Sequence, residues 1–521
     1  MWLATVVILI AGVLFYFIKP LWYWSNKGVR QSNPLPFFGD SAKLIFRKIN
    51  LYDFVKSFYD MYPNTSITGI YNFRAPVLMI KDPELIKQVA VKDFDSFTDH
   101  APSADPDADP LWCNNLFALT GDRWKEMRNL VSPTFTTSKI KIIYELMADT
   151  AEQYIKHFQA REDEVIEIEM KDVFSRFAND VIATTAFGVK VNSLEEKQNI
   201  FHRMGEKIVD FKGFLKGINF VVLSFLPRLS KILGLTLLDK EASQYFRTVI
   251  NDTIKVREEN NIVRPDMINL LLEARKSPSE NSSENEISRK RPKHAVSISN
   301  DEITSQAVIF FFAGFDTIST AMCFGAYELA LNKEIQDKLR EEIRKTTPKV
   351  GRVTYDQLQH MRYMDMVISE VLRKWPPFPM IDRISKKPYT IEPTNKNEKP
   401  VVLEAGIEVW FPIYALHRDP KYFPNPDKFD PERFSEENNS LIIPYTYIPF
   451  GAGPRLCIGN RFALIEIKSL FFNLLSNFEI VPTQKTPIPL VLKKDFQIGV
   501  ESGFWLGLKR IKSPSSLSPG N

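Results

Sequence analysis

A long apolar run in the middle of the chain restricts the fold more than any other feature of the sequence. From residue 303 to residue 331 it reads ITSQAVIFFFAGFDTISTAMCFGAYELAL, and between Ala307 and Phe324 it is apolar on nearly every face of a helix. A helix without a polar face is buried either in protein or in a membrane. Ser299 and Glu302 form a capping box at its start. We therefore predict a helix of about 32 residues, roughly 48 Å long.

Polar groups within this run favour burial in protein over a second membrane span. The helix carries one acid and three hydroxyls: Asp316, Thr317, Ser319 and Thr320. A carboxyl is unfavourable in an apolar interior unless it is paired or protonated. Gly314 lets a flat group approach the backbone, and Thr317 can hydrogen-bond to the carbonyl of Ala313. These residues predict a polar notch suited to oxygen, a water and a proton path. A packing glycine beside a capped threonine is the alternative.

Composition limits the class of protein. The chain has 521 residues, of which 44% are hydrophobic and 25% charged, enough for a large core. Its 67 basic and 63 acidic residues leave a net charge of +4. No basic stripe with interleaved aromatic residues occurs, so we expect no nucleic-acid partner. The cysteines, Cys113, Cys323 and Cys457, are too few and too widely spaced for a disulfide framework, which suits a reducing compartment.

The N-terminus predicts a membrane anchor over residues 1–24. Trp2 to Ile18 is uncharged and spans about 25 Å as a helix, and Leu21 to Trp24 extends it, with three aromatic side chains at the interface. Basic residues follow this segment and none precedes it, which places the rest of the chain in the cytosol. A cleaved signal peptide is the alternative, but neither a basic n-region nor a small-residue cleavage site is present. The Pro-rich stretch Asn33 to Asp40 predicts a stiff connector over residues 25–45.

Most of the remaining chain reads as amphipathic helices, above all from residue 120 to residue 275. Residues 66–81 predict a hairpin divided at Ala75-Pro76, and Asp82 caps a short helix that begins at Pro83. Residues 276–299 predict a flexible surface loop and residues 513–521 a disordered tail. The apolar stretch Gly213 to Leu238 is either a pair of buried helices or a surface loop that dips into the membrane.

The stretch IPFGAGPRLCIGNRF, from Ile448 to Phe462, predicts a reactive or ligating cysteine. Three glycines that permit positive φ shape the turn: Gly451, Gly453 and Gly459. Cys457 comes just before a helical run, where the helix dipole favours an anion and should lower the thiol pKa. Backbone N–H groups directed at the sulfur would moderate its electron donation. A nucleophile, a plain buried cysteine and a metal ligand are the three interpretations, and no His or Asn partner for a nucleophile is apparent nearby.

A lone thiolate suits the fifth coordination position of a haem iron, and here the sequence resembles a known family. The residues Phe450, Gly453, Arg455, Cys457 and Gly459 match the haem-binding signature of the cytochrome P-450 family. Further stretches match other motifs of that family in the same order: Trp124 with Arg128, Ala313-Gly314 with Asp316-Thr317, Glu370 with Arg373, and Pro431 to Phe434. The resemblance covers the whole chain.

The resemblance implies a mainly α fold with small β-sheets (α+β), in which residues 46–512 form a single large catalytic domain. It implies haem b held by Cys457, with propionates neutralised by Trp124, Arg128, Arg383 and Arg455. Thr317 and Asp316 would assist oxygen activation and deliver protons. Glu370, Arg373 and Arg433 would form a network that holds the cysteine turn. Where the family commonly has a hydroxyl after Thr317, this chain has Ile318, which puts a second relay hydroxyl in doubt.

The implied activity is monooxygenation of lipophilic molecules at the endoplasmic reticulum membrane, with electrons from NADPH through NADPH–cytochrome P-450 reductase and with cytochrome b5 as a further donor. Xenobiotic detoxification is the leading hypothesis; an endogenous lipid, hormone or pheromone substrate is the alternative. Rivals of other classes are a reductase-independent haem-thiolate isomerase or dehydratase and a non-enzymatic binding protein. The predicted pocket walls are Phe310, Phe311, Phe315, Pro379, Met380 and Phe504. The predicted docking cations are Arg123, Lys125, Arg461 and Lys468.

Overall fold

The computed structural model describes residues 2, 5, 12, 15–102, 104–211, 216, 219, 222–223, 227–264, 266–276, 298–395 and 397–511. Most of residues 1–14 of the predicted anchor, most of the surface loop over 276–299 and the tail 513–521 therefore lie outside the described residues. The same holds for most of residues 213–226, so the choice between buried helices and a membrane-dipping loop stays open there.

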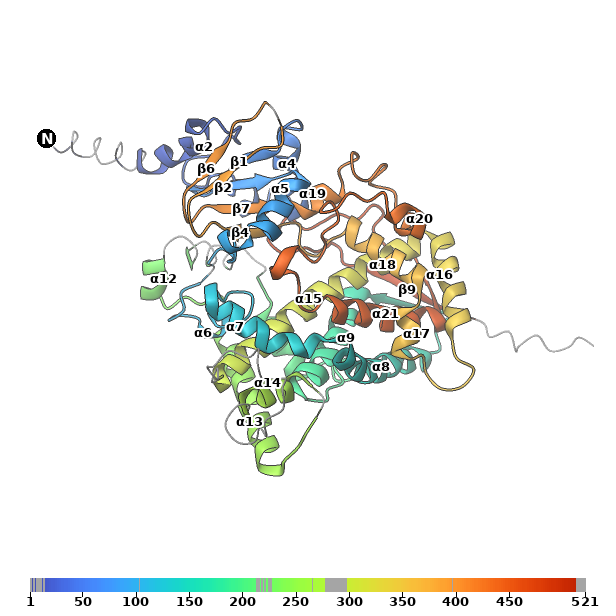
Figure 1. Ribbon diagram of the computed structural model, residues 1–521. Helices are drawn as coiled ribbons and strands as arrows, with labels where there is room; N and C mark the ends of the chain where they lie inside the picture. Colours follow the sequence, from blue (N-terminus) through green and yellow to red (C-terminus); the bar gives the residue numbers. More distant parts are fainter. Residues whose placement is uncertain are drawn as a thin grey trace, which may run out of the picture.

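The chain forms a sheet-rich corner beside a larger helical body (Figure 1). The long helices of the body are α7 (Gly121–Val131), α8 (Thr137–Gln159), α9 (Met170–Ile182), α10 (Ile200–Ile208), α13 (Lys240–Asn260), α14 (Met267–Lys276), α15 (Asn300–Leu331), α16 (Lys333–Thr346), α18 (Arg362–Lys374) and α21 (Asn460–Asn477). Helix α15 runs through its middle. The predicted mainly helical fold is confirmed.

Further helices and turns connect these elements. They are η1 (Lys19–Trp22), α2 (Tyr23–Asn26), α3 (Ala42–Ile45), α4 (Leu51–Met61), α5 (Pro83–Lys87), η2 (Gln88–Lys92), η3 (Phe94–Ser96), α6 (Pro110–Cys113), η4 (Ser132–Phe135), η5 (Ala183–Phe187), α12 (Pro227–Ile232), α17 (Tyr355–Gln359), α19 (Ile413–His417), η7 (Pro431–Phe434), α20 (Glu436–Asn439) and η8 (Gly453–Arg455). Asp82 accepts hydrogen bonds from the backbone at the start of α5, as predicted.

The described residues contain three small sheets. The first has the order β1 (Ile67–Asn72), β2 (Ala75–Ile80), β7 (Glu408–Phe411) and β4 (Ile381–Ile384). The second joins β3 (Val165–Glu169), β9 (Trp505–Arg510) and β8 (Phe478–Val481), and the third pairs β5 (Tyr389–Ile391) with β6 (Val401–Leu403). Strand β3 lies in a region where the sequence predicted mostly amphipathic helices and no particular strand.

The predicted hairpin over residues 66–81 is present, but its turn was misplaced. Asn72 pairs with Ala75, so the turn consists of Phe73 and Arg74, and Pro76 lies inside β2 opposite Tyr71. Proline is tolerated in this position because the partner strand β7 joins β2 only from Val77 onward. Phe73 adopts the left-handed conformation, with φ 56°. The turn therefore needs neither glycine nor proline, which is why the sequence signal pointed elsewhere.

Trp24 belongs to the sheet and not to a membrane interface. The prediction of an interfacial belt was wrong for this residue: its side chain is fully buried, and its indole nitrogen donates to the carbonyl of Ile70 at 3.2 Å. Its ring lies against Gly69, where any side chain would collide with it. The neighbouring Trp22 stays 52% exposed. The folded body thus begins no later than the helix that contains Trp24.

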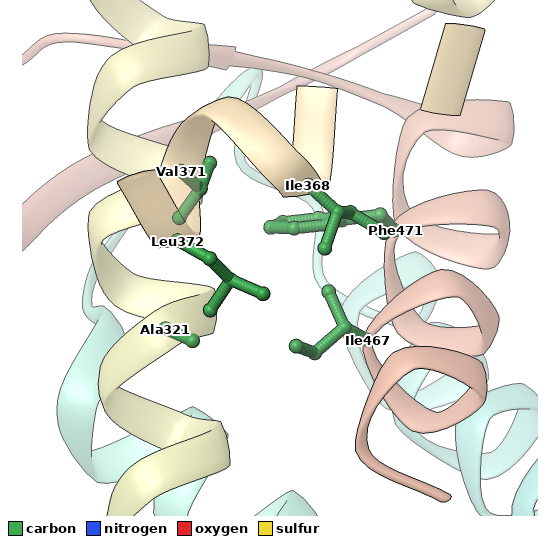
Figure 2. Close-up of a pocket in the computed structure, with 6 residues that line it drawn as sticks. All are labelled: Ala321, Ile368, Val371, Leu372, Ile467 and Phe471. Carbon is green, nitrogen blue, oxygen red and sulfur yellow. The ribbon is translucent and has the colours of Figure 1, made fainter. Parts of the chain in front are cut away.

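Helix α15 is the central helix of the core, as its composition predicted. The Ser299–Glu302 capping box fixes its start, and it ends at Leu331. Of the described residues, this is the one helix long and apolar enough to cross a membrane, and 72% of its most apolar window is buried inside the body. Figure 2 shows the apolar contact of α15, α18 and α21 around Ala321, Ile368 and Phe471. The small space between these side chains is lined only by apolar groups, so we interpret it as imperfect packing and not as a ligand site.

Candidate active site

The loop before α21 is shaped by two glycines. Gly451 and Gly453 have φ values of 83° and 71°, which side chains other than glycine rarely adopt. At Gly453 a Cβ atom would also collide with the carbonyl oxygen of Ala90 in η2. Gly459, predicted to share this conformation, has φ −88°, so it is needed for neither reason. The loop can therefore pack closely under η2 only with glycine at position 453.

Cys457 offers its sulfur to the interior of the body. Its backbone N–H donates to the carbonyl of Phe450 at 2.9 Å, which closes the loop. The side chain has exposed surface, yet burial by the surrounding protein raises the pKa of the thiol. A thiol that is exposed and yet surrounded by protein faces a recess or an internal space of the fold. The predicted lowering of this pKa was wrong, because burial outweighs the Gly459 N–H directed at the sulfur and the charge of Arg128.

Helix α15 presents two different faces around the predicted notch. Ala313 is exposed although its helix is otherwise mostly buried, and the hydroxyl of Thr317 donates to the Ala313 carbonyl, as predicted. Gly314 points the other way: a Cβ there would lie 2.7 Å from the side chain of Ile182 in α9. The interpretation of Gly314 as room for a flat ligand was therefore wrong. It allows α9 and α15 to approach each other closely.

Asp316 has a basic partner that the sequence did not reveal. The ammonium of Lys171, at the start of α9, lies 2.9 Å from the Asp316 carboxylate. It also donates to the hydroxyls of Ser319 at 2.8 Å and Thr320 at 2.7 Å. The Lys171 and Asp316 side chains stay 27% and 24% exposed. No spacing rule links two residues 145 positions apart in the chain, so only the fold could identify Lys171.

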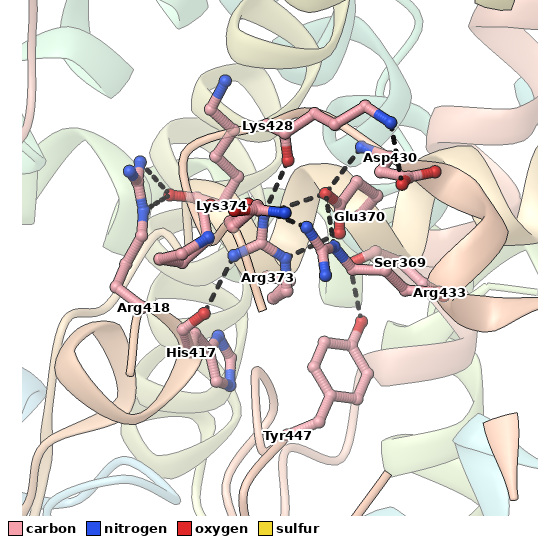
Figure 3. Close-up of polar contacts among 12 residues, drawn as sticks. Ser369, Glu370, Arg373, Lys374, His417, Arg418, Lys428, Asp430, Arg433 and Tyr447 are labelled. Atoms are coloured by element: carbon pink, nitrogen blue, oxygen red, sulfur yellow. Dashed lines mark hydrogen bonds and ion pairs between the residues drawn. The ribbon is translucent and has the colours of Figure 1, made fainter. Parts of the chain in front are cut away.

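The predicted network around Glu370 is present (Figure 3). Arg373 binds the Glu370 carboxylate through two nitrogens at 2.6 and 2.8 Å, and both side chains are fully buried. Arg433 in η7 adds a second guanidinium at 3.5 Å, an ion pair without hydrogen-bond geometry. The backbone N–H of Asp430 donates to the same carboxylate at 2.8 Å. The acid is therefore surrounded by donors, which makes the network a rigid structural element.

Two buried guanidiniums lie near the cysteine loop. Arg455 donates to protein oxygens of the following residues: Thr98, Asp99, Leu116, Phe117 and Leu119. Its guanidinium lies 4.1 Å from the centre of the Trp124 ring. Burial and repulsion by Arg383 lower the Arg455 pKa to about 9. Burial likewise lowers the pKa of Arg383 to about 10. Within the described residues, the Nε of Arg383 has no hydrogen-bond partner.

Several predicted wall residues are core residues instead. Phe311 and Phe315 stack on each other at 5.1 Å, and both are buried against α10, η5 and α13. Phe504 is buried against Phe324, and Pro379 is buried as well. Only Phe310 and Met380 of that set retain partial exposure. The apolar run could not reveal which side of α15 faces a ligand.

One aromatic group that the sequence reasoning missed lies on α15 itself. The ring of Phe312, next to the exposed Ala313, is partly exposed. The centre of its ring lies 5.6 Å from that of Trp112 in α6 and 5.5 Å from that of Phe211, just past the end of α10. Three segments that are distant in sequence therefore meet at one aromatic cluster beside the exposed face of α15.

The predicted docking cations also differ in accessibility. Lys468 was wrongly assigned to the surface: its side chain is 1% exposed and pairs with Asp365 at 2.7 Å. Arg123 is held by Glu126 and Glu302. Lys125 and Arg461 are exposed.

The whole chain matches known proteins of one kind. A family model described as Cytochrome P450 matches residues 29–503. The chain is 40% identical to cytochrome P450 9e2 of Blattella germanica, over 98% of each sequence. It is 38% identical to cytochrome P450 9b2 of Drosophila melanogaster over 91% of this chain and 92% of the relative, and 37% identical to cytochrome P450 6k1 of Blattella germanica over 98% and 97%. The chain belongs to the cytochrome P450 family. The protein is thus a P450 monooxygenase, and its cofactor is a haem with a thiolate ligand.

The residues around Cys457 fit the haem of a P450. An interior-facing thiol with a backbone N–H directed at it suits the axial ligand of the iron. Two buried guanidiniums that repel each other, one with an unpartnered Nε, suit the two carboxylates of a porphyrin. Arg128 reaches the loop from α7 and donates to the carbonyl of Leu456 at 2.9 Å. Donor set, charge and burial therefore agree with the cofactor that the family requires.

Proposed function

We propose that this P450 oxidises lipophilic small molecules, foreign compounds among them, with electrons that reach it from NADPH through cytochrome P450 reductase. Cytochrome b5 would be a second donor. The single observation that carries the proposal is the setting of Cys457, a thiol with exposed surface whose pKa is raised by the surrounding protein, in a closed loop between η8 and α21. What the haem supplies, once bound to this sulfur, is reductive activation of O2 and insertion of one oxygen atom into the substrate.

The charges around the loop would hold the cofactor. Arg383 and Arg455 would bind the two propionates, and relief of their mutual repulsion supports this role. Trp124 would order the Arg455 guanidinium through its ring face. Arg128 would position the loop through the Leu456 carbonyl. The N–H of Gly459 would moderate electron donation from the sulfur.

The polar residues of α15 would move protons. The hydroxyl of Thr317 is oriented by the Ala313 carbonyl on the exposed face of the helix. Asp316 retains contact with solvent and holds a lysine that also binds two hydroxyls. Those hydroxyls, on Ser319 and Thr320, would serve where Ile318 offers none. Protons would reach Thr317 through Asp316 and Lys171.

The substrate would lie against the aromatic cluster of Phe312, Trp112 and Phe211. Apolar and aromatic walls with few polar groups favour lipophilic ligands. The same preference suits a membrane location, because lipophilic substrates partition into lipid. Near the end of α12, Ile232 is 80% and Leu233 58% exposed, which supports contact of this region with a membrane. Lys125 and Arg461 would contribute to docking of an acidic redox partner.

A carbon monoxide difference spectrum tests the proposal. The reduced protein with carbon monoxide should give a thiolate band near ~450 nm, and Cys457→Ala should lose it. A wild-type protein without that band would overturn the proposal. Product formation should then require reductase and NADPH together. Turnover of a peroxide substrate without either would instead identify a haem-thiolate isomerase or dehydratase.

A further inference from the structure

Two side chains outside the family motifs connect the Glu370 network to the cysteine loop. His417 is the last residue of α19 and is fully buried. Its carbonyl accepts a hydrogen bond from Arg373 at 2.8 Å, and its ring Nε2 accepts one from the backbone N–H of Ile448 at 3.0 Å. Ile448 is the first residue of the stretch from Ile448 to Phe462, which contains Cys457. One residue therefore contacts the network, as Figure 3 shows, and the loop as well.

The bond to Ile448 fixes the protonation of the His417 ring. A backbone N–H can only donate, so Nε2 carries no proton and the neutral ring is protonated at Nδ1. Burial and the charge of Arg373 keep the pKa of His417 at about 3, in agreement with a neutral ring. The Nδ1 atom has no hydrogen-bond partner in the described structure, although the carbonyls of Leu372 and Arg373 lie close enough to influence it. Only the Nε2 bond is therefore well formed.

Tyr447 makes a second connection beside the first. Its hydroxyl donates to the carbonyl of Ser369, the residue before Glu370, at 3.0 Å. Its ring lies 5.2 Å from the His417 ring and 4.8 Å from Phe434 of η7. Residues 447 and 448 are thus each attached to the helix or network by a separate hydrogen bond.

The two attachments continue to the cysteine through backbone bonds. The carbonyl of Ile448 accepts from the N–H of Gly451 at 2.9 Å, and the carbonyl of Phe450 accepts from the N–H of Cys457 at 2.9 Å. A continuous path of hydrogen bonds and a few covalent links therefore runs from Glu370 through Arg373, His417 and Ile448 to Cys457.

We propose that His417 and Tyr447 are positioning residues that transmit the rigidity of the Glu370 network to the Cys457 loop and so keep the sulfur in place for iron ligation. His417 acts through its Nε2 acceptor and Tyr447 through its hydroxyl. This inference rests on the proposed role of Cys457 as the iron ligand. A merely structural role in core packing would depend on the shape of the His417 ring and not on its acceptor.

Variants at position 417 separate acceptor from shape. His417→Phe keeps a flat ring but has no acceptor, whereas His417→Gln offers an acceptor near the position of Nε2. Losing one acceptor for a buried N–H changes an equilibrium by roughly tenfold. We expect His417→Phe to lose haem to excess apomyoglobin about ten times faster than the wild type, with a smaller thiolate band. His417→Gln should stay within about twofold of the wild type, because its acceptor replaces the lost one.

Hydrogen exchange at the Ile448 amide reads the connection directly, with or without bound haem. The amide should exchange faster in His417→Phe and remain protected in His417→Gln. Tyr447→Phe removes one oxygen atom and provides a milder variant if His417→Phe does not fold; it should accelerate haem loss less. His360→Phe, at an exposed histidine, is the matched control and should change neither readout.

The outcomes separate this inference from the proposed function. Unchanged haem loss and unchanged Ile448 exchange in both His417→Phe and Tyr447→Phe would overturn the inference while leaving the function intact. Equal losses in His417→Phe and His417→Gln would refute the acceptor role and leave only packing. A wild-type protein without the thiolate band would refute the function, and the amide exchange would still decide whether His417 holds the loop.

Discussion

Glu370 and Asp316 are both acids paired with a base, but they differ in burial and in the number of donors around them. Glu370 is fully buried and bound by Arg373, Arg433 and a backbone N–H. Asp316 is 24% exposed and bound to Lys171. The first arrangement fixes the carboxylate in one position. The second keeps solvent contact, which the proposed role of Asp316 in carrying protons requires.

Replacing Glu370 should have the largest effect. Glu370→Gln leaves the buried guanidinium of Arg373 and the largely buried one of Arg433 without a counter-charge, and breaking a buried pair costs about 3–5 kcal/mol. We expect a loss of that size in the free energy of unfolding, together with poor haem incorporation. Chemical denaturation and the carbon monoxide spectrum measure the two effects.

A surface pair provides the control for that variant. Glu432 lies in the same η7 region, 2.6 Å from Lys338, but the two side chains are 48% and 57% exposed. Exposed pairs contribute about 0–1 kcal/mol, so Glu432→Gln should be nearly neutral. Equal destabilisation by both variants would show that charge pairing in general, and not burial, sets the stability of this region.

Acid should destabilise the folded protein through two buried histidines. Burial lowers the pKa of His417 to about 3 and that of His202 to about 4, from an unperturbed value of 6.5. Below pH 6.5 the unfolded chain therefore binds protons that the folded protein does not. Stability should fall as the pH drops from 6.5 toward 4, by up to about 1.4 kcal/mol per pH unit for each histidine.

Denaturant titrations at several pH values measure that slope. His417→Gln cannot titrate, so its slope should be smaller than that of the wild type by up to one histidine's share. Identical slopes in His417→Gln and the wild type would contradict a neutral His417 in the folded protein.

A substitution on the face of α15 that packs against α9 should have a smaller effect on stability. Gly314→Ala places a methyl group 2.7 Å from the Ile182 side chain. Overpacking costs about 1–3 kcal/mol, and the gain in helix propensity returns about 1 kcal/mol. We expect a net loss of about 1 kcal/mol with an unchanged thiolate band. Loss of the band without loss of stability would restore the interpretation that Gly314 faces the haem.

The sequence predicted local features well, but it did not predict which face of helix α15 is buried and which is exposed. The capped helix from Asn300 to Leu331 was predicted correctly, because its capping box and apolar length are local signals. The pairing of Glu370 with Arg373 was also visible, since residues three apart share a helix face. A helix that is apolar on every face does not indicate which face is exposed. The sequence could therefore not distinguish the buried Phe311 and Phe315 from the partly exposed Phe312.

Long-range partners were invisible for a different reason. The partnership of Lys171 with Asp316 and that of His417 with Ile448 depend on how distant segments pack. The pKa of the Cys457 thiol likewise could not be predicted from local sequence. A helix N-terminus favours a thiolate, but burial by the remainder of the fold outweighs it. No local pattern reports the amount of protein that will surround a residue.

Replacing Lys171 should have the smallest effect on stability and is the sharpest test of the contrast between the two acids. Lys171→Met removes a partly exposed pair, so the free energy of unfolding should fall by less than about 1 kcal/mol. The thiolate band should remain, because within the described residues the hydrogen bonds and the ion pair of Lys171 are to Asp316, Ser319 and Thr320. If Asp316 carries protons in company with Lys171, the product formed per NADPH consumed should nevertheless fall several-fold. Asp316→Asn should lower that ratio further, since it removes the acid itself. Destabilisation comparable to that of Glu370→Gln, with unchanged coupling, would make Asp316 a second scaffold residue and erase the distinction.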